Sequence, residues 1–396
     1  MAAPQLSRNE PAAAPGDEPA IDVSVVLPCL NEEASVAACV KHALTWFERS
    51  GLRGEVIVVD NGSTDRSREE AERAGARVIE ERRRGYGAAH RRGFAESRGD
   101  IIVMADADAT YDLLQLDPLI EPLRQGYDMT VGNRMDSMSP GAMTWSHRFI
   151  GTPAISLLLR LFAGSRLGDS QCGLRAFTRE AYERMDLRST GMELASEMIL
   201  KASRRGLKVA ERPVPYAVRV GESKLNTFRD GWRHLRFLLV HSPMFLFLIP
   251  GLVLSVLGLL ALAITLGASS GITVGSLTWQ PVFAGAILLS VGTNSLVIGM
   301  ASHMYAVSRG ILEEDGLARA FRRHVSLERV LALAAVPLAI GVGLDGLLFL
   351  RWIGGAPFGV PAVGTAALAQ SGIIVGANLV LGGFLLALIE VDERED

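Results

Sequence analysis

Two carboxylates one residue apart, Asp106 and Asp108, are the clearest candidates for chemistry in the sequence. They follow the strictly apolar run 101–105, which is typical of a buried strand. Paired carboxylates at a strand end can bind Mg²⁺ or Mn²⁺ together with a diphosphate, and Thr110 offers a further oxygen ligand. The same pattern also fits an ordinary turn in which the aspartates only cap the backbone. The sequence alone leaves both interpretations open.

Two more polar loops follow apolar runs upstream. Residues 23–27 lead into Pro28, Asn31 and Glu32, and residues 55–59 end at Asp60 in a turn rich in Asn, Gly, Ser and Thr. Further strands are predicted at 77–80, 101–105 and 129–132, and amphipathic or charged helices separate the strands. This alternation predicts an α/β sheet with parallel strands. Ligands bind such sheets at the carboxyl ends of the strands, where these loops fall.

The distribution of charge divides the chain. Residues 1–236 hold 33 basic and 33 acidic side chains, whereas residues 237–308 contain no Asp, Glu, Lys or Arg at all. A soluble domain does not need such a stretch, so we expect a charged globular part followed by a membrane part. The net charge of −3 argues against a nucleic-acid partner. The predicted divisions are a disordered tail at 1–21, a catalytic domain at 22–225, an interfacial helix at 226–242, four membrane helices within 243–389 and a C-terminal tail at 390–396.

Orientation follows from the arginines. We expect membrane helices near 243–267, 282–306, 330–350 and 366–389, each long enough to span a hydrocarbon core of about 30 Å. The connection after the second helix contains five arginines, whereas the connection after the first has no basic residue. Arginine-rich connections stay on the cytosolic side. The sequence therefore predicts a multi-pass protein of the cell membrane, with the catalytic domain and both termini in the cytosol.

Two segments border the membrane part. Residues 149–161 are apolar but too short to span a bilayer, so they form either a core helix or a helix on the membrane surface. Residues 226–240 alternate arginines with Phe228, Trp232 and Phe237, which suits an interfacial helix beside anionic head groups. An ordinary solvated helix that leads into the first span is the alternative for 226–240.

The motifs together resemble family 2 glycosyltransferases. LPCLNEE at 27–33, VVDNGSTD at 58–65 and DAD at 106–108 occur in the order and at the spacing of that family. The resemblance implies a GT-A (Rossmann-like) domain with Mg²⁺ or Mn²⁺ as cofactor. It implies donor nucleotide binding by Pro28, Asn31, Glu32, Asp60, Gly85, Arg91 and Asp106, and metal binding by Asp106, Asp108 and Thr110. Many relatives carry Gln or Glu where this chain has Thr110, which leaves the third metal ligand open.

Further blocks resemble the polyprenyl-phosphate branch of the family. They are GYGAA at 85–89, GNR at 132–134, DSQCGLRAF at 169–177 and RVGESK at 219–224. The resemblance implies an enzyme of the dolichol-phosphate mannose or glucose synthase type. The residues expected at the acceptor and its phosphate are Arg148, Arg175, Arg219, Ser223 and Lys224, and those expected to be catalytic are Asp108, Asp169 and Arg134.

The basic residues agree with the chemistry of such a reaction. A lipid phosphate is already an anion at neutral pH, so it can attack a sugar carbon without a strong base. What the enzyme must supply is stabilisation of the departing diphosphate and tolerance of a second anion, tasks for a metal and for Arg or Lys. Asp169 is either a base or orienting group at the acceptor, or a loop carboxylate that holds Arg175 or a backbone amide. Glu197 either contacts the donor or belongs to an ion-paired helix face.

We therefore expect inverting transfer of one sugar, glucose or mannose, from a nucleotide-diphosphate sugar such as UDP-glucose or GDP-mannose to membrane polyprenyl phosphate. A glycosyltransferase that acts on another lipid or on a polysaccharide is one alternative. A non-catalytic membrane scaffold or transporter that binds a nucleotide sugar is another. The sequence leaves open whether the chain forms a homo-oligomer.

Overall fold

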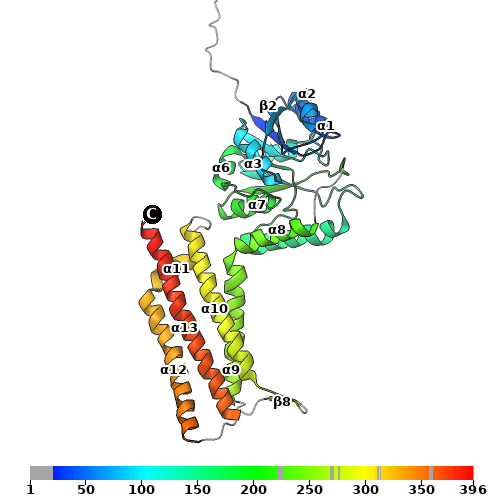
Figure 1. Cartoon of the computed structure of the whole chain (residues 1–396). Helices are drawn as coiled ribbons and strands as arrows, with labels where there is room; N and C mark the ends of the chain where they lie inside the picture. The colour runs from blue at the N-terminus through cyan, green and yellow to red at the C-terminus, as the bar shows by residue number, and fades with distance from the viewer. Residues whose placement is uncertain are drawn as a thin grey trace, which may run out of the picture. The chain divides into compact units, whose positions relative to one another are not determined.

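The computed structural model describes residues 21–221, 227–267, 272–274, 277–309, 312, 314–355 and 360–395. The expected N-terminal tail therefore lies almost wholly outside the described residues. The chain divides into two compact units, Met1–Leu238 and Leu239–Asp396. Figure 1 labels helices and strands of both units.

The first unit is built on a seven-stranded sheet in the order β3-β2-β1-β4-β6-β5-β7. Its strands are β1 (Val23–Cys29), β2 (Gly54–Asp60), β3 (Arg77–Glu80), β4 (Ile101–Met104), β5 (Met129–Asn133), β6 (Arg175–Thr178) and β7 (Val209–Pro213). Strands β1 to β4 pair in parallel, which confirms the α/β expectation for this half. Strand β6 runs antiparallel to both β4 and β5, so the sheet is mixed rather than wholly parallel.

Helices cover the sheet because their apolar faces need burial. In α1, the side chains of Val36, Cys39, Val40, Ala43 and Trp46 recur at helical spacing and are all buried. The helices of this unit are α1 (Val36–Ser50), α2 (Ser67–Arg73), α3 (Tyr86–Glu96), α4 (Asp117–Arg124), η1 (His147–Gly151), α5 (Thr152–Ala163), α6 (Arg179–Met185), α7 (Leu194–Arg204) and α8 (Thr227–Val240). Strands β1, β2 and β4 are apolar on both faces, as expected for central strands.

The second unit contains four helices long and apolar enough to cross a membrane: Met244–Thr265, Pro281–Ser308, Leu327–Ile353 and Val363–Ile389. Its elements are η2 (Met244–Leu248), α9 (Ile249–Gly267), β8 (Ile272–Val274), β9 (Leu277–Trp279), α10 (Pro281–Ser308), α11 (Gly316–His324), α12 (Leu327–Ile353) and α13 (Val360–Glu395). Figure 1 shows the long helices lying side by side. The four expected spans are thus present. Helix α13 continues to Glu395, so the segment expected as a C-terminal tail is helical up to that residue.

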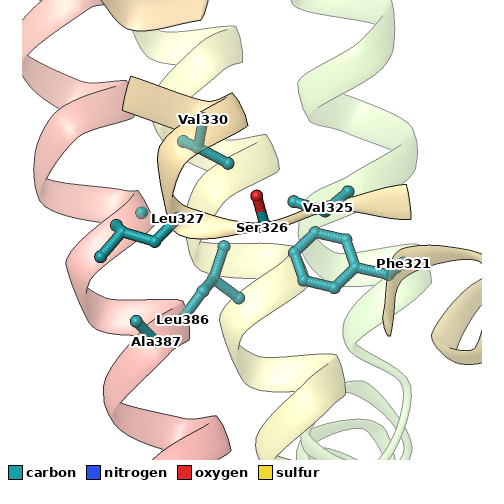
Figure 2. A pocket seen from close by; sticks show the side chains of 8 residues that line it. Phe321, Val325, Ser326, Leu327, Val330, Leu386 and Ala387 are labelled. Atoms are coloured by element: carbon teal, nitrogen blue, oxygen red, sulfur yellow. The ribbon is translucent and has the colours of Figure 1, made fainter. Parts of the chain in front are cut away.

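Small residues bring the spans into contact. A Cβ at Gly292 of α10 would lie 2.5 Å from the backbone nitrogen of Ser255, and one at Gly341 of α12 would lie 2.5 Å from the carbonyl oxygen of Ala369. Such close backbone approach is how membrane helices associate. A small pocket lies where Phe321 and Val330 face Leu386 of α13 (Figure 2). Its lining has one polar side chain, Ser326, and no ionisable group.

Candidate active site

The carboxyl ends of β1, β2 and β4 place three acidic side chains at one edge of the sheet. In the parallel register Cys29 of β1 pairs with Asp60 of β2, and the backbone of Ala105 hydrogen-bonds to Val26 of β1. Asp106 and Asp108 follow at once. The edge predicted from the sequence is therefore the edge where the polar loops meet.

Asp106 is held from two sides. The Tyr86 hydroxyl, from the first turn of α3, donates a 2.9 Å hydrogen bond to its Oδ1. On the other side, a Cβ at Gly173 would lie only 2.7 Å from Oδ2, so this position has no room for a larger residue. Burial, together with the negative charge of Asp108, raises the pKa of Asp106 to about 7. A cation bound at this edge would offset both effects.

Asp108 is buried and its oxygens have separate partners. Its Oδ1 accepts hydrogen bonds from the backbone nitrogen of Thr110 at 3.1 Å and from the Thr110 hydroxyl at 2.6 Å. Its Oδ2 forms an ion pair with Arg219 Nη1 at 3.3 Å. Thr110 was expected as a metal ligand, but here its hydroxyl holds the Asp108 carboxylate in place.

The loops after β1 and β2 are joined by direct hydrogen bonds. Asn31 Oδ1 accepts from the backbone of Thr64 at 2.7 Å, and the backbone of Glu32 donates to the Ser67 hydroxyl at 2.7 Å. Asp60 fixes its own turn by accepting from the backbone of Ser63 at 3.0 Å. Pro28 lies within β1, in register with Val59 of β2. Four of the residues expected at the nucleotide therefore lie at the adjacent ends of β1 and β2: Pro28, Asn31, Glu32 and Asp60.

Backbone conformation marks the same loops. Asn31 and Ala109 have φ values of 52° and 60°, in the left-handed region that non-glycine residues seldom adopt. Each such residue costs free energy, and such strain tends to persist at functional sites where the surroundings enforce it. Here the enforcing contacts are the hydrogen bonds of Asn31 to the β2 loop and those of Thr110 to Asp108.

The first turn of α3 is fixed by a loop that Glu197 of α7 anchors. Glu197 accepts hydrogen bonds from the backbones of Arg188 and Ser189 at 2.9 and 2.8 Å and pairs with Lys201 at 2.9 Å. Thr190 of that loop accepts from the backbone of Ala88, and a Cβ at Gly85 would lie 2.1 Å from its carbonyl oxygen. Of the two interpretations of Glu197, donor contact or an ion-paired helix face, these contacts match the ion-paired helix face.

Arg91 also contacts this loop. Its Nη1 donates to the carbonyl of Arg188 at 2.8 Å. The expected donor-binding residues Gly85 and Arg91 thus both lie beside the loop that Glu197 holds, and they support the Tyr86 turn.

Arg134 and Asp169 form a buried bidentate ion pair. Arg134 Nε and Nη2 lie 2.7 and 2.8 Å from the two oxygens of Asp169, and the backbone of Arg134 also donates to Oδ2. Asp169 is fully buried and also accepts from the backbone of Gln171 at 3.2 Å. Its oxygens are thus occupied, as in the alternative of a loop carboxylate. Its partner is Arg134 rather than the expected Arg175.

Arg175 corrects one sequence-based expectation. It was expected at a phosphate, but its guanidinium is fully buried and donates to the carbonyls of Cys172, Ala195 and Ser170 at 2.8 to 2.9 Å. Burial lowers its pKa. With these donors engaged, Arg175 holds the backbone of the 170–172 loop instead of contacting a ligand.

The other expected acceptor residues are dispersed. Arg219 lies at the acidic pair, where its guanidinium contacts both Glu32 and Asp108. Arg148 lies on η1, with its guanidinium 5.4 Å from the centre of the Phe149 ring. Ser223 and Lys224 lie outside the described residues. Among the described residues that were expected to bind the acceptor, Arg219 is the one that contacts Asp108.

Sequence reasoning missed Tyr86 and Gly173 as residues that hold Asp106. Both fall inside blocks that were singled out, GYGAA and DSQCGLRAF. A tyrosine between two glycines at the start of a helix was a usable signal, because a buried phenol needs a hydrogen-bond partner. The contact of Gly173 with Asp106 joins residues far apart in the chain, so no local pattern reveals it.

The acidic pair fits a divalent cation. Among the residues that the structure describes, no cluster of three or more His, Cys, Asp or Glu side chains could enclose a metal. Mg²⁺, however, is commonly bound by one or two carboxylates together with substrate phosphates. Asp106 and Asp108 provide two such carboxylates. The raised pKa of Asp106 and the ion pair of Asp108 with Arg219 both indicate that positive charge is favourable at this position.

A mixed sheet with polar loops after β1 and β2 and an acidic pair after β4 is the arrangement expected of a GT-A glycosyltransferase. Comparison with known proteins agrees. Residues 24–187 match glycosyl transferase family 2, and residues 300–390 match the family 2 C-terminal transmembrane region. The chain is 39% identical over 369 residues to the low-salt glycan biosynthesis hexosyltransferase of Haloferax volcanii, covering 92% of this chain and 88% of the relative. The chain therefore belongs to the family 2 glycosyltransferases and is an integral membrane enzyme.

Other relatives match the catalytic part. A dolichyl-phosphate hexose transferase of Haloferax volcanii is 33% identical over 213 residues, which is 53% of this chain and 89% of that protein. Among solved structures, glucosyl-3-phosphoglycerate synthase from Mycobacterium tuberculosis with Mn²⁺, UDP and glucosyl-3-phosphoglycerate is 27% identical. The match covers 55% of this chain and 79% of that one, with a TM-score of 0.46.

Proposed function

We propose that this enzyme transfers one hexose, with inversion, from a nucleotide-diphosphate sugar to a polyprenyl phosphate in the membrane. The observation that carries the proposal is the contact of Arg219 with Asp108, because it joins a cation-binding carboxylate to an anion-binding side chain. The relative named as a dolichyl-phosphate hexose transferase supports the same acceptor. The four spans place the enzyme where such a lipid resides.

The donor lies on the β1 and β2 side of the site in this proposal. Asp60 and the Asn31–Glu32 loop hold the nucleoside, while Asp106 and Asp108 face the diphosphate. Tyr86 and Gly173 fix Asp106, and Thr110 fixes Asp108, so that both carboxylates are already oriented before the donor arrives. When bound there, Mg²⁺ or Mn²⁺ supplies Lewis-acid stabilisation of the diphosphate.

The acceptor phosphate lies at Arg219. Its Nε is buried and has no hydrogen-bond partner among the described residues, so one N–H donor is available to an anion. A phosphate oxygen attacks the sugar C1, and the bond from C1 to the diphosphate oxygen breaks, with its electron pair leaving on the nucleoside diphosphate. A single displacement inverts C1. Because the acceptor is already anionic, no proton has to be removed, which agrees with Asp169 being committed to Arg134.

The cytosolic orientation is part of the same proposal. The connection between the second and third spans contains Arg309, Arg319, Arg322, Arg323 and Arg329, which favours the cytosolic side for that connection and for the catalytic unit. Cytosolic nucleotide sugars would then reach the site directly.

A donor screen tests the proposal. The full chain in lipid nanodiscs, with Mg²⁺ or Mn²⁺ and polyprenyl phosphate, is incubated with labelled UDP-glucose, GDP-mannose and other sugar nucleotides. We expect label in the organic phase with one donor, and none with Asp108→Asn that is inserted and folded. Absence of lipid label with every donor contradicts the proposal.

A further inference from the structure

Helix α10 carries an amide side chain at the middle of its length. Asn294 lies 13 residues from Pro281 and 14 residues from Ser308, which at about 1.5 Å per residue is about 20 Å from either end of the helix. In a span of this length, that position falls near the centre of a hydrocarbon core about 30 Å thick. A polar side chain at such a depth needs a hydrogen-bond partner, because the lipid chains offer none.

The two polar side chains beside Asn294 are satisfied within the chain. The hydroxyl of Thr293 donates to the carbonyl of Leu289 at 2.7 Å, and the hydroxyl of Ser295 donates to the carbonyl of Phe247 at 2.9 Å. Asn294 itself is exposed and has no hydrogen bond to any residue that the structure describes. Its amide therefore needs a partner from outside this part of the chain.

The face of α10 that carries Asn294 is otherwise apolar. Ile287, Val291 and Ile298 lie three, four and seven residues from Asn294, so they share its face, and their side chains are 40% to 64% exposed. The opposite face packs closely on α9, where a Cβ at Gly292 would lie 2.5 Å from a backbone nitrogen. One amide within an apolar helix face is a feature of paired helices, because it fixes the register and the number of partners.

A second copy of the same chain meets the requirements of this face. Copies inserted in one membrane share an orientation, so a two-fold axis between them runs along the bilayer normal and brings equivalent residues to the same depth. An amide donates through Nδ2 and accepts at Oδ1, so two Asn294 side chains can exchange two hydrogen bonds. Because residues 237–308 contain no Asp, Glu, Lys or Arg, pairing this face with itself brings no like charges together.

We propose that this protein forms a dimer in the membrane through α10, with Asn294 hydrogen-bonded to the partner's Asn294 near the bilayer centre. Ile287, Val291 and Ile298 pack across the two-fold axis on either side of this amide pair. The inference goes beyond the proposed reaction and does not depend on it, because the association of membrane helices requires neither donor nor acceptor.

Disulfide cross-linking of the full chain in membranes tests the interface. The native cysteines are buried and burial raises their thiol pKa values to about 11 or 12, so cross-links report on introduced cysteines. Ile287→Cys and Ile298→Cys, oxidised with copper phenanthroline, should give mostly covalent dimer, whereas Leu381→Cys of α13, at a side chain 69% exposed, should stay monomeric. Equal cross-linking at Leu381→Cys overturns the proposal, because the contacts are then random collisions. Preferential cross-linking at Ala339→Cys, on an exposed position of α12, overturns it in favour of another interface.

Substitution of the amide tests its part in the association. Copies labelled with a fluorescent donor or acceptor at Arg82→Cys, a side chain 90% exposed, are diluted with lipid, and energy transfer gives the association constant. Asn294→Leu should lower this constant about tenfold, and Asn294→Gln, which keeps an amide, should largely preserve it. Thr293→Val is the matched control, because its hydroxyl is satisfied within α10, and it should associate like wild type. An unchanged constant in Asn294→Leu overturns the proposal. Loss of sugar transfer with unchanged association would concern only the proposed reaction.

Discussion

Arg219 Nη1 lies 3.3 Å from Asp108 Oδ2, so a positive charge stands beside the carboxylate expected to hold a metal. The backbone around Arg219 fixes this relationship. Ala217 donates to the carbonyl of Thr110 at 2.9 Å, and Val220 donates to the carbonyl of Asp108 at 3.1 Å. Arg219 therefore lies on a segment that is hydrogen-bonded to the acidic loop. In the proposed reaction its charge would neutralise Asp108 before the metal binds and would then bind the acceptor phosphate.

The first prediction concerns competition at Asp108. Arg219→Ala should bind Mn²⁺ about two- to fivefold more tightly without substrates, because an ion pair worth roughly 0.5–1 kcal/mol no longer opposes the metal. Sugar transfer should nevertheless fall by about 100-fold, as expected when one preorganised donor that stabilises negative charge is lost. A Mn²⁺ titration followed by electron paramagnetic resonance measures the affinity. Arg66→Ala, which removes an exposed ion pair with Glu33, is the control. Weaker Mn²⁺ binding in Arg219→Ala would contradict the account.

The second prediction concerns the space beside Asp106. Gly173→Ala places a Cβ 2.7 Å from Asp106 Oδ2, so the carboxylate must move. Mn²⁺ affinity should fall about tenfold and transfer should fall with it, because the groups around a metal ligand fix its orientation. Gly231→Ala is the control, since a Cβ there meets no atom within 4 Å. Unchanged Mn²⁺ affinity in Gly173→Ala would show that Asp106 Oδ2 is not needed for the metal.

The third prediction separates two roles of Asp169. Asp169→Asn leaves Arg134 buried without its counter-charge, which should cost about 3–5 kcal/mol of stability. Thermal unfolding of the purified chain followed by circular dichroism measures the loss. Thr130→Val is the comparison, because it removes a buried hydroxyl that has no hydrogen-bond partner among the described residues and should cost nothing. If Asp169 were a catalytic base, Asp169→Asn would keep its stability and lose only turnover.

The fourth prediction concerns pH and stability. His90 of α3 is fully buried, and burial, together with the positive charge of Arg175, lowers its pKa to about 3. In the unfolded chain the pKa of histidine is about 6.5, so the unfolded state binds the extra proton between these values. The contribution of neutral His90 is therefore fully present above about pH 6.5 and is lost as the pH falls toward 3.

For the catalytic unit, about 2 kcal/mol should be lost between pH 7 and pH 5 through this group alone. His90→Phe keeps an aromatic ring between Tyr86 and Phe94 and should lose that part of the pH dependence. Denaturant unfolding at the two pH values measures it. An equal loss of stability in wild type and His90→Phe would show that His90 does not carry it.

The central strands were predictable because burial on both faces leaves a continuous apolar run. Strands β1, β2 and β4 have such a run, and the predicted ranges of β1 to β5 agree with the structure within about two residues. Strand β6 was not predicted because it begins with Arg175, a charged residue that normally signals a surface. The carbonyls that satisfy Arg175 come from a loop and from α7, and such long-range partners leave no local pattern.

The candidate site was likewise predictable only in part. Asp60, Asp106 and Asp108 could be placed from the sequence because strand ends have a defined position in a parallel sheet. The partner of each arginine could not be, since spacing does not separate an arginine that binds ligand from one that holds a loop. Arg134 and Arg175 proved to be buried beneath the site, whereas Arg219 contacts the acidic pair.

The acceptor is the central claim, and product analysis tests it most directly. With the donor that the screen selects, the full chain is offered polyprenyl phosphate, the matching polyprenol and diacylglycerol in separate nanodiscs, and the lipid products are weighed by mass spectrometry. The account predicts one hexose on polyprenyl phosphate, with the phosphate retained, and no product from the two lipids that lack a phosphate. Glycosylation of diacylglycerol or polyprenol at a comparable rate, or a chain of several sugars, would contradict it.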